Sequence, residues 1–280
     1  MEIIILDNNL LRGTIPTHIA RLQNLTVFSL ELNFLNGTLP TELENLSLLE
    51  ELILYENSLS GEIPSQLGSL VNLVTFDVDV NQFDGPIPPE LGNLASLTAL
   101  YLRDNFLNGT VPDSFVNHSA IERIDMADNL LAGQVDTSLW LTWSNCNLIN
   151  LGNNGFDDEL PTHLGELTAL TYLDIYDNLF HGFIPTQLGD MTSLEYLYLE
   201  DNFFEGNLPS QLAQIPSLKL IHAHINDLTG VVPSELCDKV RDEGMELKVD
   251  CSLLLCDCGC LCSEDDEDEK RQRKERKQRL

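Results

Sequence analysis

The sequence is poor in positive charge and in long apolar runs, and it lacks the short motifs of common catalytic sites. Only 15 Lys and Arg residues stand against 45 Asp and Glu residues, which gives a formal net charge of −30. No apolar run reaches the roughly 18 residues of a membrane span. No Ser-His-Asp order, glycine-rich phosphate loop or H-E-x-x-H motif occurs. We therefore predict that the chain is not an enzyme and holds no cofactor.

The charge is also uneven along the chain. Residues 263–280 form a charged tail in which six acids precede seven bases, with a seventh acid among the bases. The rest of the chain, the body, therefore carries 38 acids (45 − 7) against 8 bases (15 − 7). Such a body repels nucleic-acid backbones and anionic lipids, and we expect basic or neutral partners instead. The tail is predicted to be disordered, although its basic half also resembles a nuclear import signal.

A 24-residue repeat fills most of the chain. The pattern LxxLxLxxNxLxGxIPxxLxxLxx starts at residues 1, 25, 49, 73, 97, 121, 146, 170, 194 and 218, and only the sixth unit is longer, at 25 residues. Apolar residues at the fourth and sixth positions, with one residue between them, have the period of a half-buried strand. The recurrent Gly and Pro argue against helices throughout. We predict an α/β solenoid with a parallel sheet on its concave side and short 3-10 or helical turns opposite.

An asparagine occupies the ninth position of every repeat. A buried amide both donates and accepts hydrogen bonds, so a stacked column of asparagines can satisfy the bending backbone of successive turns. The predicted ladder consists of Asn9, Asn33, Asn57, Asn81, Asn105, Asn129, Asn154, Asn178, Asn202 and Asn226.

The half-repeat LxGxIPxxLGxL resembles the plant-type leucine-rich repeat (LRR) over residues 1–236. That class occurs in receptor-like kinase ectodomains, in polygalacturonase-inhibiting proteins and in algal proteins with a Cys-rich C-terminal cap. The resemblance implies recognition of a peptide or protein on the concave or lateral face, usually outside the cell. It implies no catalysis, because a fold alone does not assign an activity.

The first repeat has no capping segment before it. Met1 stands at the first core position, and Ile3 and Ile5 fall on an unpaired apolar edge strand. We expect the solenoid to be truncated at its N-terminus, with a targeting segment, a cap and further repeats upstream. A shielding partner is the alternative.

Six of the seven cysteines follow the last repeat closely. A dense, even-numbered cluster at the end of a solenoid predicts a disulfide-stapled cap over residues 237–262, in which "ELKVDCSLL" adds a last strand. Its members are Cys237, Cys251, Cys256, Cys258, Cys260 and Cys262. Soft-metal binding by C-x-C thiolates is the alternative. Cys146, at a core position, is interpreted as a small buried hydrophobe.

Two further features bear on the surface. The sixth repeat replaces Pro by Asp136 and adds Trp140 and Trp143, which we interpret as fillers of a locally altered groove; an exposed partner site is the alternative. Sequons for N-glycosylation, consistent with an oxidising compartment, begin at Asn24, Asn36, Asn45, Asn108 and Asn117.

The candidate binding face comprises the third, fifth, seventh and eighth positions of the repeats, which we expect to project from the concave sheet. Acids interleaved with tyrosines suit a basic or amide-rich peptide, although they also suit an ordinary solvated strand surface. The candidates are Asp77, Asp79, Tyr101, Arg103, Asp104, Asp125, Asp128, Tyr172, Asp174, Tyr176, Asp177, Tyr196, Tyr198, Glu200, Asp201, His222 and His224. A metal held by His222, His224 and Glu200 is a less specific alternative, and no metal site is predicted.

Taken together, these patterns predict a non-enzymatic recognition module at the cell surface or outside the cell, similar to the ectodomain of a receptor-like protein. The alternative is an intracellular scaffold whose cap is reduced or metal-bound.

Overall fold

The computed structural model describes residues 2–252 and 254–262, and the charged tail predicted to be disordered lies outside these residues. The chain divides into two compact units, of which unit 1 ends at Asn154 and unit 2 begins at Gly155. Each unit is described by itself. Within the described residues, no helix combines the length and apolarity required to cross a bilayer.

The repeat that begins at Leu97 shows the anatomy of one turn. Its first strand, β9 (Ala99–Tyr101), covers the third to fifth positions, and Asp104 then takes a left-handed conformation with φ 53°. A second strand, β10 (Phe106–Gly109), follows the ladder asparagine. Pro112 precedes the 3-10 helix η5 (Asp113–Asn117), which returns the chain to the next repeat.

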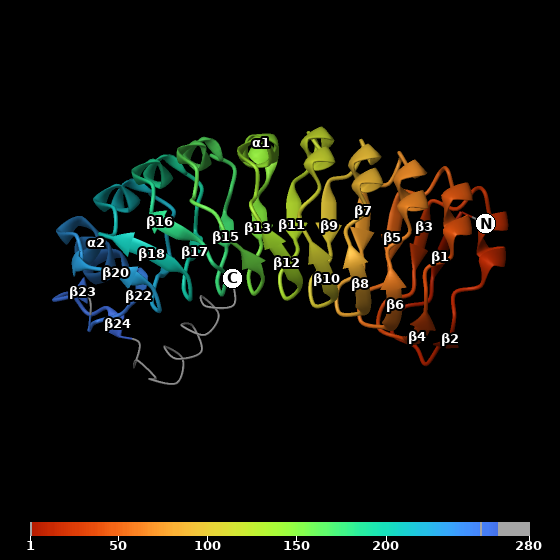
Figure 1. Ribbon diagram of the computed structural model, residues 1–280, viewed down its shortest axis with the longest axis horizontal. Coiled ribbons are helices and arrows are strands. Elements are labelled where there is room, and N and C mark those ends of the chain that lie inside the picture. Colours follow the sequence, from red (N-terminus) through yellow and green to blue (C-terminus); the bar gives the residue numbers. More distant parts are fainter. Residues whose placement is uncertain (1, 253, 263–280) are drawn as a thin grey trace. The chain divides into compact units, whose positions relative to one another are not determined.

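Unit 1 stacks such turns into two parallel sheets, whose strands lie side by side in Figure 1. Its first sheet has the order β1 (Ile3–Ile5), β3 (Val27–Ser29), β5 (Glu51–Ile53), β7 (Thr75–Asp77), β9, β11 (Arg123–Asp125) and β13 (Leu148–Asn150). Its second sheet has the order β2 (Arg12–Gly13), β4 (Phe34–Gly37), β6 (Ser58–Glu62), β8 (Gln82–Pro86), β10 and β12 (Leu130–Gly133). The returns are η1 (Thr17–Arg21), η2 (Thr41–Asn45), η3 (Ser65–Ser69), η4 (Pro89–Asn93), η5, α1 (Thr137–Thr142) and η6 (Trp143–Asn145).

Unit 2 repeats this arrangement and adds the cap. Its first sheet has the order β15 (Tyr172–Asp174), β17 (Tyr196–Tyr198), β19 (Leu220–His222), β22 (Glu246–Val249) and β24 (Leu261–Cys262). Its other strands are β14 (Gly155–Phe156), β16 (His181–Phe183), β18 (Phe203–Gly206), β20 (Asp227–Leu228), β21 (Gly230–Val231) and β23 (Leu254–Leu255). Its helical segments are η7 (Thr162–Glu166), η8 (Thr186–Asp190), η9 (Ser210–Gln214), α2 (Ser234–Asp238) and the π-helical turn η10 (Lys239–Glu243).

The asparagine ladder has the predicted geometry. Asn105 donates through Nδ2 to the carbonyls of Leu102 at 3.2 Å and Arg103 at 3.1 Å in its own turn, and to Val78 of the preceding turn at 3.0 Å. Its Oδ1 accepts from the N–H of Phe83 at 2.9 Å. Each amide therefore closes its own turn and ties it to the turn before, which fixes the 24-residue register. Asn9 is the exception, because it is exposed and bonds only within its own turn.

The tryptophans of the sixth repeat are core residues. Trp140 and Trp143 are 1% and 0% exposed and meet edge to face, with ring centroids 5.4 Å apart. The residue inserted here allows α1 to replace the usual 3-10 helix, and the Asp136 carboxylate caps it by accepting from the N–H of Ser138 at 2.8 Å. The filler interpretation is confirmed, and the exposed partner site at these tryptophans is wrong.

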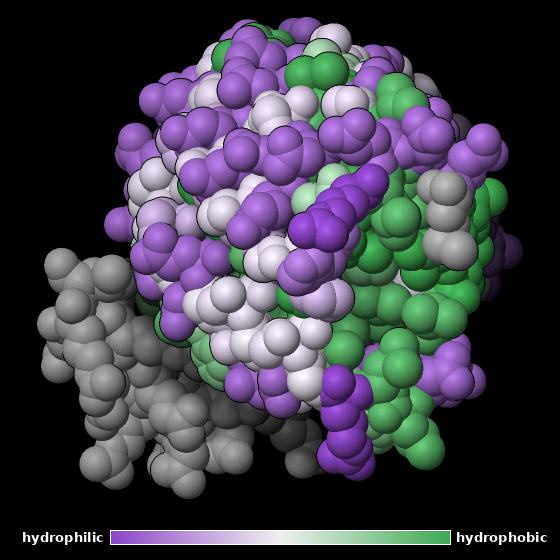
Figure 2. All heavy atoms as spheres, turned by 90° about the vertical axis from the view of Figure 1, so that its right-hand side faces the viewer, coloured by the Kyte–Doolittle hydropathy of each residue, from purple (hydrophilic) through white to green (hydrophobic). Residues whose placement is uncertain are grey.

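The first repeat leaves an apolar surface at one end of unit 1. Ile3 and Ile5 are 56% and 58% exposed, and Leu10 is 79% exposed. Figure 2 looks onto this end, where hydrophobic side chains gather. Strand β1 pairs with β3, so the predicted open apolar edge is present in unit 1.

Three disulfides staple the cap of unit 2, as predicted. They join Cys237 to Cys258, Cys251 to Cys262 and Cys256 to Cys260. The segment predicted to add a last strand forms β22, which pairs in register with β19. Cys146 is buried and unpaired, and burial raises the pKa of its thiol to about 12.

We expect the substitution Asn105→Ala to lower the free energy of unfolding by about 2–4 kcal/mol, because it strands carbonyl and N–H groups of two turns in the core. The matched substitution Asn9→Ala, at the exposed member of the ladder, should change it by less than about 0.5 kcal/mol. Urea unfolding of both variants measures the difference. Equal effects would contradict the role of the ladder as a link between turns.

We also expect an alkylating reagent to label Cys146 but not the disulfide-bonded cap cysteines once the chain is unfolded. The native protein should resist iodoacetamide, and unfolding without reductant should expose the single thiol of Cys146, because a buried neutral thiol is inert. Peptide mapping without reduction should then recover the three cap bridges. Labelling of cap cysteines in the unreduced, unfolded chain would show that this pairing is wrong.

Candidate functional site

The candidate residues of unit 1 form a row across its first sheet. Asp77 on β7, Tyr101 on β9 and Asp125 on β11 are register partners, each at the fifth position of its repeat. Because neighbouring strands lie about 4.8 Å apart, the two aspartates flank the tyrosine within about 10 Å of each other. All three side chains are half-buried. The 24-residue repeat therefore places two acids and one aromatic ring on one continuous surface.

The carboxylates of Asp77 and Asp125 in this row, and that of Asp79 at its rim, are hard to ionise. Asp77 accepts the N–H of Asp79 at 3.0 Å, and Asp79 accepts the N–H of Arg103 at 2.6 Å. Desolvation, with repulsion from Asp77 and Asp125, raises the pKa of Asp79 to about 8. Desolvation, with repulsion from Glu31 and Asp125, raises the pKa of Asp77 to about 6. Burial also raises the pKa of Asp125. At Asp79, repulsion from the neighbouring acids thus outweighs the attraction of Arg103.

The seventh and eighth positions lie beyond the strands, contrary to the expectation that they project from the sheet. The first-sheet strands end at the fifth position, and the eighth position is the left-handed turn before the ladder asparagine. Asp104, Asp128, Asp177 and Asp201 are such turn residues, with φ of 48–55°. Asp128 binds the Arg103 guanidinium, with 2.9 Å between Oδ2 and Nε. These residues rim the sheet, and only the third and fifth positions line it.

The tyrosines of unit 2 form a cluster. The ring centroid of Tyr172 lies 6.2 Å from that of Tyr196 and 5.4 Å from that of Tyr198. Asp174 accepts the Tyr172 hydroxyl at 2.9 Å and the N–H of Tyr176 at 3.1 Å. Asp174 is only 6% exposed, and its carboxylate is engaged by these two tyrosines, so its assignment as a ligand contact stays a prediction.

His222 lies between two carboxylates in unit 2. Its Nε2 is 2.8 Å from Glu246 Oε1, and its Nδ1 is 3.7 Å from Glu200 Oε1. Desolvation raises the pKa of Glu200 to about 7, and its Oε2 is buried without a hydrogen-bond partner. The imidazole therefore lies between Glu246 on β22 and Glu200, which follows β17. It does not gather His222, His224 and Glu200 around one point, as a metal would require.

His224 is a largely buried member of the candidate set, and its assignment to the binding face stays a prediction. It is 7% exposed, and its ring meets that of His222 edge to face at 5.8 Å. Desolvation, with repulsion from Lys248, lowers its pKa to about 4. The sequence analysis missed Glu246 and Lys248, which β22 brings onto the same sheet as partners of Leu220 and His222. The alternation in "ELKV", with Leu and Val buried, is the signal that could have identified them.

The soft-metal alternative at the cap has a geometric basis. The Sγ atoms of Cys256, Cys258 and Cys260 all lie within 4.8 Å of one another, a group close enough for one ion among the described residues. The structure pairs these sulfurs in disulfides, which removes the thiolates that Zn²⁺ or Cu(I) needs.

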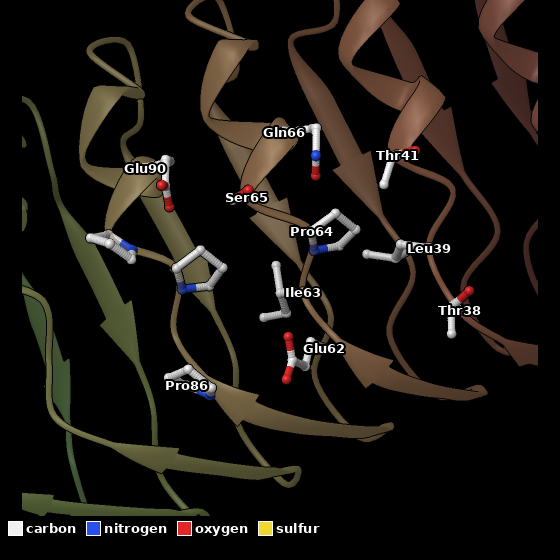
Figure 3. Close-up of a pocket in the computed structure, with 12 residues that line it drawn as sticks. Thr38, Leu39, Thr41, Glu62, Ile63, Pro64, Ser65, Gln66, Pro86 and Glu90 are labelled. Atoms are coloured by element: carbon white, nitrogen blue, oxygen red, sulfur yellow. The ribbon is translucent and has the colours of Figure 1, made fainter.

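A shallow open groove runs beside the second sheet of unit 1 (Figure 3). Its walls come from the Ile-Pro turns of successive repeats, so Ile63 and Pro64 lie between Leu39 and Pro86. Glu62 and Glu90 are its acids, and Thr38 lies at one end.

Comparisons with known proteins agree with the repeat and the fold. The family model described as Leucine Rich Repeat matches residues 48–70, 72–94, 96–118, 169–191 and 193–215. A comparison with curated proteins found no match.

Three solved structures illustrate the similarity. The LRR ectodomain of the plant membrane receptor kinase GASSHO1/SCHENGEN3 from Arabidopsis thaliana, in complex with CASPARIAN STRIP INTEGRITY FACTOR 2, is 34% identical, with a TM-score of 0.76 and coverage of 89% of this chain and 32% of that one. The Arabidopsis receptor kinase HAESA, in complex with the peptide hormone IDA and the co-receptor SERK1, is 28% identical and has a TM-score of 0.75. The match covers 88% of this chain and 45% of the HAESA chain. A plant ice-binding protein is 28% identical, with a TM-score of 0.74 and coverage of 94% and 84%.

The chain thus spans about a third to just under a half of these two receptor structures. The predicted LRR solenoid is confirmed by the match to the family model, by the stacked parallel strands and by these neighbours. The assignment of individual residues to ligand binding stays a prediction.

We expect stability to fall as pH rises, because of Asp79. Its pKa is raised from 3.8 to about 8, so the folded state keeps a proton that the unfolded chain has lost. This contribution is complete below about pH 4 and is lost as pH rises through about 8. Asp79→Asn, whose Oδ1 can still accept from Arg103, should reduce the fall in unfolding free energy between pH 5 and 8. Asp84→Asn, at an exposed acid on β8, is the matched control, and identical slopes for both variants would contradict the assignment.

Proposed function

We propose that this chain, which is built of leucine-rich repeats of the plant receptor type, is a non-enzymatic recognition module that binds a basic or neutral peptide. The binding surface is the acidic, tyrosine-bearing face of its first sheets. In unit 1 it centres on Asp77, Tyr101 and Asp125, and Arg103 and Asp128 lie at its rim. In unit 2 it centres on Tyr196, Tyr198 and His222, with Glu200 and Glu246 as its acids.

The comparisons support the class of ligand. The GASSHO1/SCHENGEN3 ectodomain and HAESA both appear in complexes with a named factor or peptide hormone. Their LRR regions are 34% and 28% identical to this chain and share its stacked sheets. A solenoid of this kind offers an extended row of side chains, which suits an extended peptide better than a compact small molecule.

The row of poorly ionised carboxylates carries the proposal. Asp77 and Asp79 have raised pKa values because they are desolvated next to other acids. A Lys or Arg side chain placed on this row would supply the missing positive charge and draw the carboxylates into the ionised state. Tyr101, between Asp77 and Asp125, offers a flat ring for the aliphatic part of such a side chain.

The three disulfides support a location outside the cytosol, because such bridges persist in oxidising compartments. The alternative, an intracellular scaffold, requires the same six cysteines to be reduced or metal-bound. Peptide mapping of the cap therefore also tests the location.

We expect a lysine-rich fluorescent peptide to bind with an affinity that falls about tenfold, or about 1.4 kcal/mol, in the double variant Asp77→Asn, Asp79→Asn. The wild-type affinity should rise between pH 5 and 8, because the bound cation favours the ionised carboxylates. Fluorescence anisotropy at constant ionic strength measures both effects.

Two controls separate a specific site from general attraction to an acidic protein. Asp84→Asn removes an exposed acid from the second sheet and should leave the affinity unchanged. A glutamate-rich peptide of the same length should not bind. Equal losses at Asp84 and at the Asp77–Asp79 pair would show that the first-sheet row is not the binding site.

A further inference from the structure

The pentapeptide "FLNGT" occurs twice in unit 1, at residues 34–38 and 106–110. Each copy is a sequon whose asparagine, Asn36 or Asn108, follows a phenylalanine by two residues. Phe34 and Phe106 are 48% and 55% exposed, so each ring presents apolar area to solvent beside its sequon. Neither ring is buried in the core, so both are available to a group attached to the neighbouring asparagine.

The strand geometry places each ring beside its sequon. In β10, Phe106 and Asn108 are exposed and the intervening Leu107 is buried, and β4 repeats this pattern around Leu35. Residues two apart on a strand point to the same side with their Cα atoms about 6.6 Å apart. That separation is close to the width of one pyranose ring, so a sugar on the asparagine can reach the phenylalanine.

A third sequon shows that spacing alone does not create this arrangement. Phe115 also precedes a sequon asparagine, Asn117, by two residues, but it lies in η5 and is 0% exposed. At Asn24 and Asn45 the residue two positions earlier is a leucine. Among the five sequons, an exposed ring two residues before the asparagine is found at Asn36 and Asn108, whose sequons lie on second-sheet strands.

We propose that Asn36 and Asn108 carry N-linked glycans, and that the first N-acetylglucosamine of each packs its C–H face on the exposed ring of Phe34 or Phe106. This assignment rests on the extracellular location in the proposed function. Carbohydrate C–H groups carry partial positive charge and the aromatic face is negative, so the contact combines area burial with electrostatic attraction. It would cover the two exposed rings without any protein partner.

The modification requires no chemistry from this chain. A host glycosyltransferase joins the Asn Nδ2 to C1 of the first sugar of a lipid-diphosphate-linked oligosaccharide. The bond from C1 to the diphosphate oxygen breaks, the lipid diphosphate leaves with that electron pair, and the amide nitrogen loses one proton to a base. Both asparagines are exposed and so are available to such an enzyme.

The two sites differ in one respect. The guanidinium of Arg12 lies 4.9 Å from the centroid of the Phe34 ring, so one side of that ring already has a cation. Among the described residues, no cation lies over the Phe106 ring, which also has the larger exposed fraction. Asn108 is therefore the clearer site for a test.

The placement also bears on recognition. All five sequon asparagines are exposed and lie off the first sheet: Asn36 and Asn108 on second-sheet strands, Asn45 and Asn117 in 3-10 helices, and Asn24 in the turn between η1 and β3. Thr38, the last residue of the first FLNGT copy, lies at the end of the groove in Figure 3. Glycans would thus crowd that groove and leave the first-sheet row of unit 1 open.

A double-mutant cycle on the full chain, secreted from a eukaryotic cell line, tests the contact. It compares the wild type, Phe106→Ser, Asn108→Gln and the double variant by thermal unfolding. Loss of the glycan should lower Tm by about 2 °C or more when Phe106 is present, and by less than about 1 °C when Ser replaces it. Asn117→Gln is the matched control, and its effect should not depend on residue 106. In NMR spectra, protons of the first sugar at Asn108 should shift upfield, and the shift should vanish in Phe106→Ser.

Each outcome decides a different point. If Asn108 carries a glycan but the effect of losing it on Tm does not depend on Phe106, and the sugar protons are unshifted, the packing contact is wrong. The extracellular location would not be affected by that result. Unmodified Asn36 and Asn108 in the secreted protein would overturn the modification itself. Neither result affects the peptide titration on the first sheet, so a failure here is distinguishable from a failure of the proposed function.

Discussion

The hydrogen bonds of the ninth-position asparagine constrain the rest of the fold. One amide reaches two carbonyls of its own turn, one carbonyl of the preceding turn and one N–H, as Asn105 does. To present that amide, the residue before it must adopt a left-handed conformation, and residues as unsuited to it as Val80 and Ile225 do so with φ of 53° and 55°. The strand before this turn can then hold only a few residues. The short strands, the polar turn and the parallel register are all consequences of the same four bonds.

This constraint explains why so much of the fold could be predicted. The pattern needs no tertiary information, because each turn is local and its partner lies one repeat away. The irregular sixth turn was also predictable from its own residues. A missing proline, one added residue and two tryptophans indicate a locally altered groove that larger side chains fill. The cap strand was predictable for the same reason, since "ELKV" has the alternation of the strands that it extends.

The site was predicted less well, because the sequence shows the period of a strand but not where the strand ends. The seventh and eighth positions were assigned to the sheet by extending the alternation, and the left-handed turn breaks it there. The sequence also does not show which outward positions neighbouring side chains cover. Asp174 and His224 occupy outward positions, yet both are more than nine-tenths buried. Glu246 entered the site from outside the repeats, so counting repeat positions could not include it.

The repeat also gives each turn two different exposed strands, and the sequence uses them differently. The first sheet of unit 1 and its rim carry acids whose ionisation is suppressed by desolvation and mutual repulsion, and a cation placed beside them would favour their ionised form. The second sheet carries two exposed rings beside sequons, and the proposed glycans would cover this apolar area without a protein partner. A glycan cannot neutralise the first surface, and a basic peptide gains little from the second.

Because the two strands of one turn are separated by the asparagine turn, a change on one face need not disturb the other. The ladder that fixes the fold therefore also keeps the two surfaces independent.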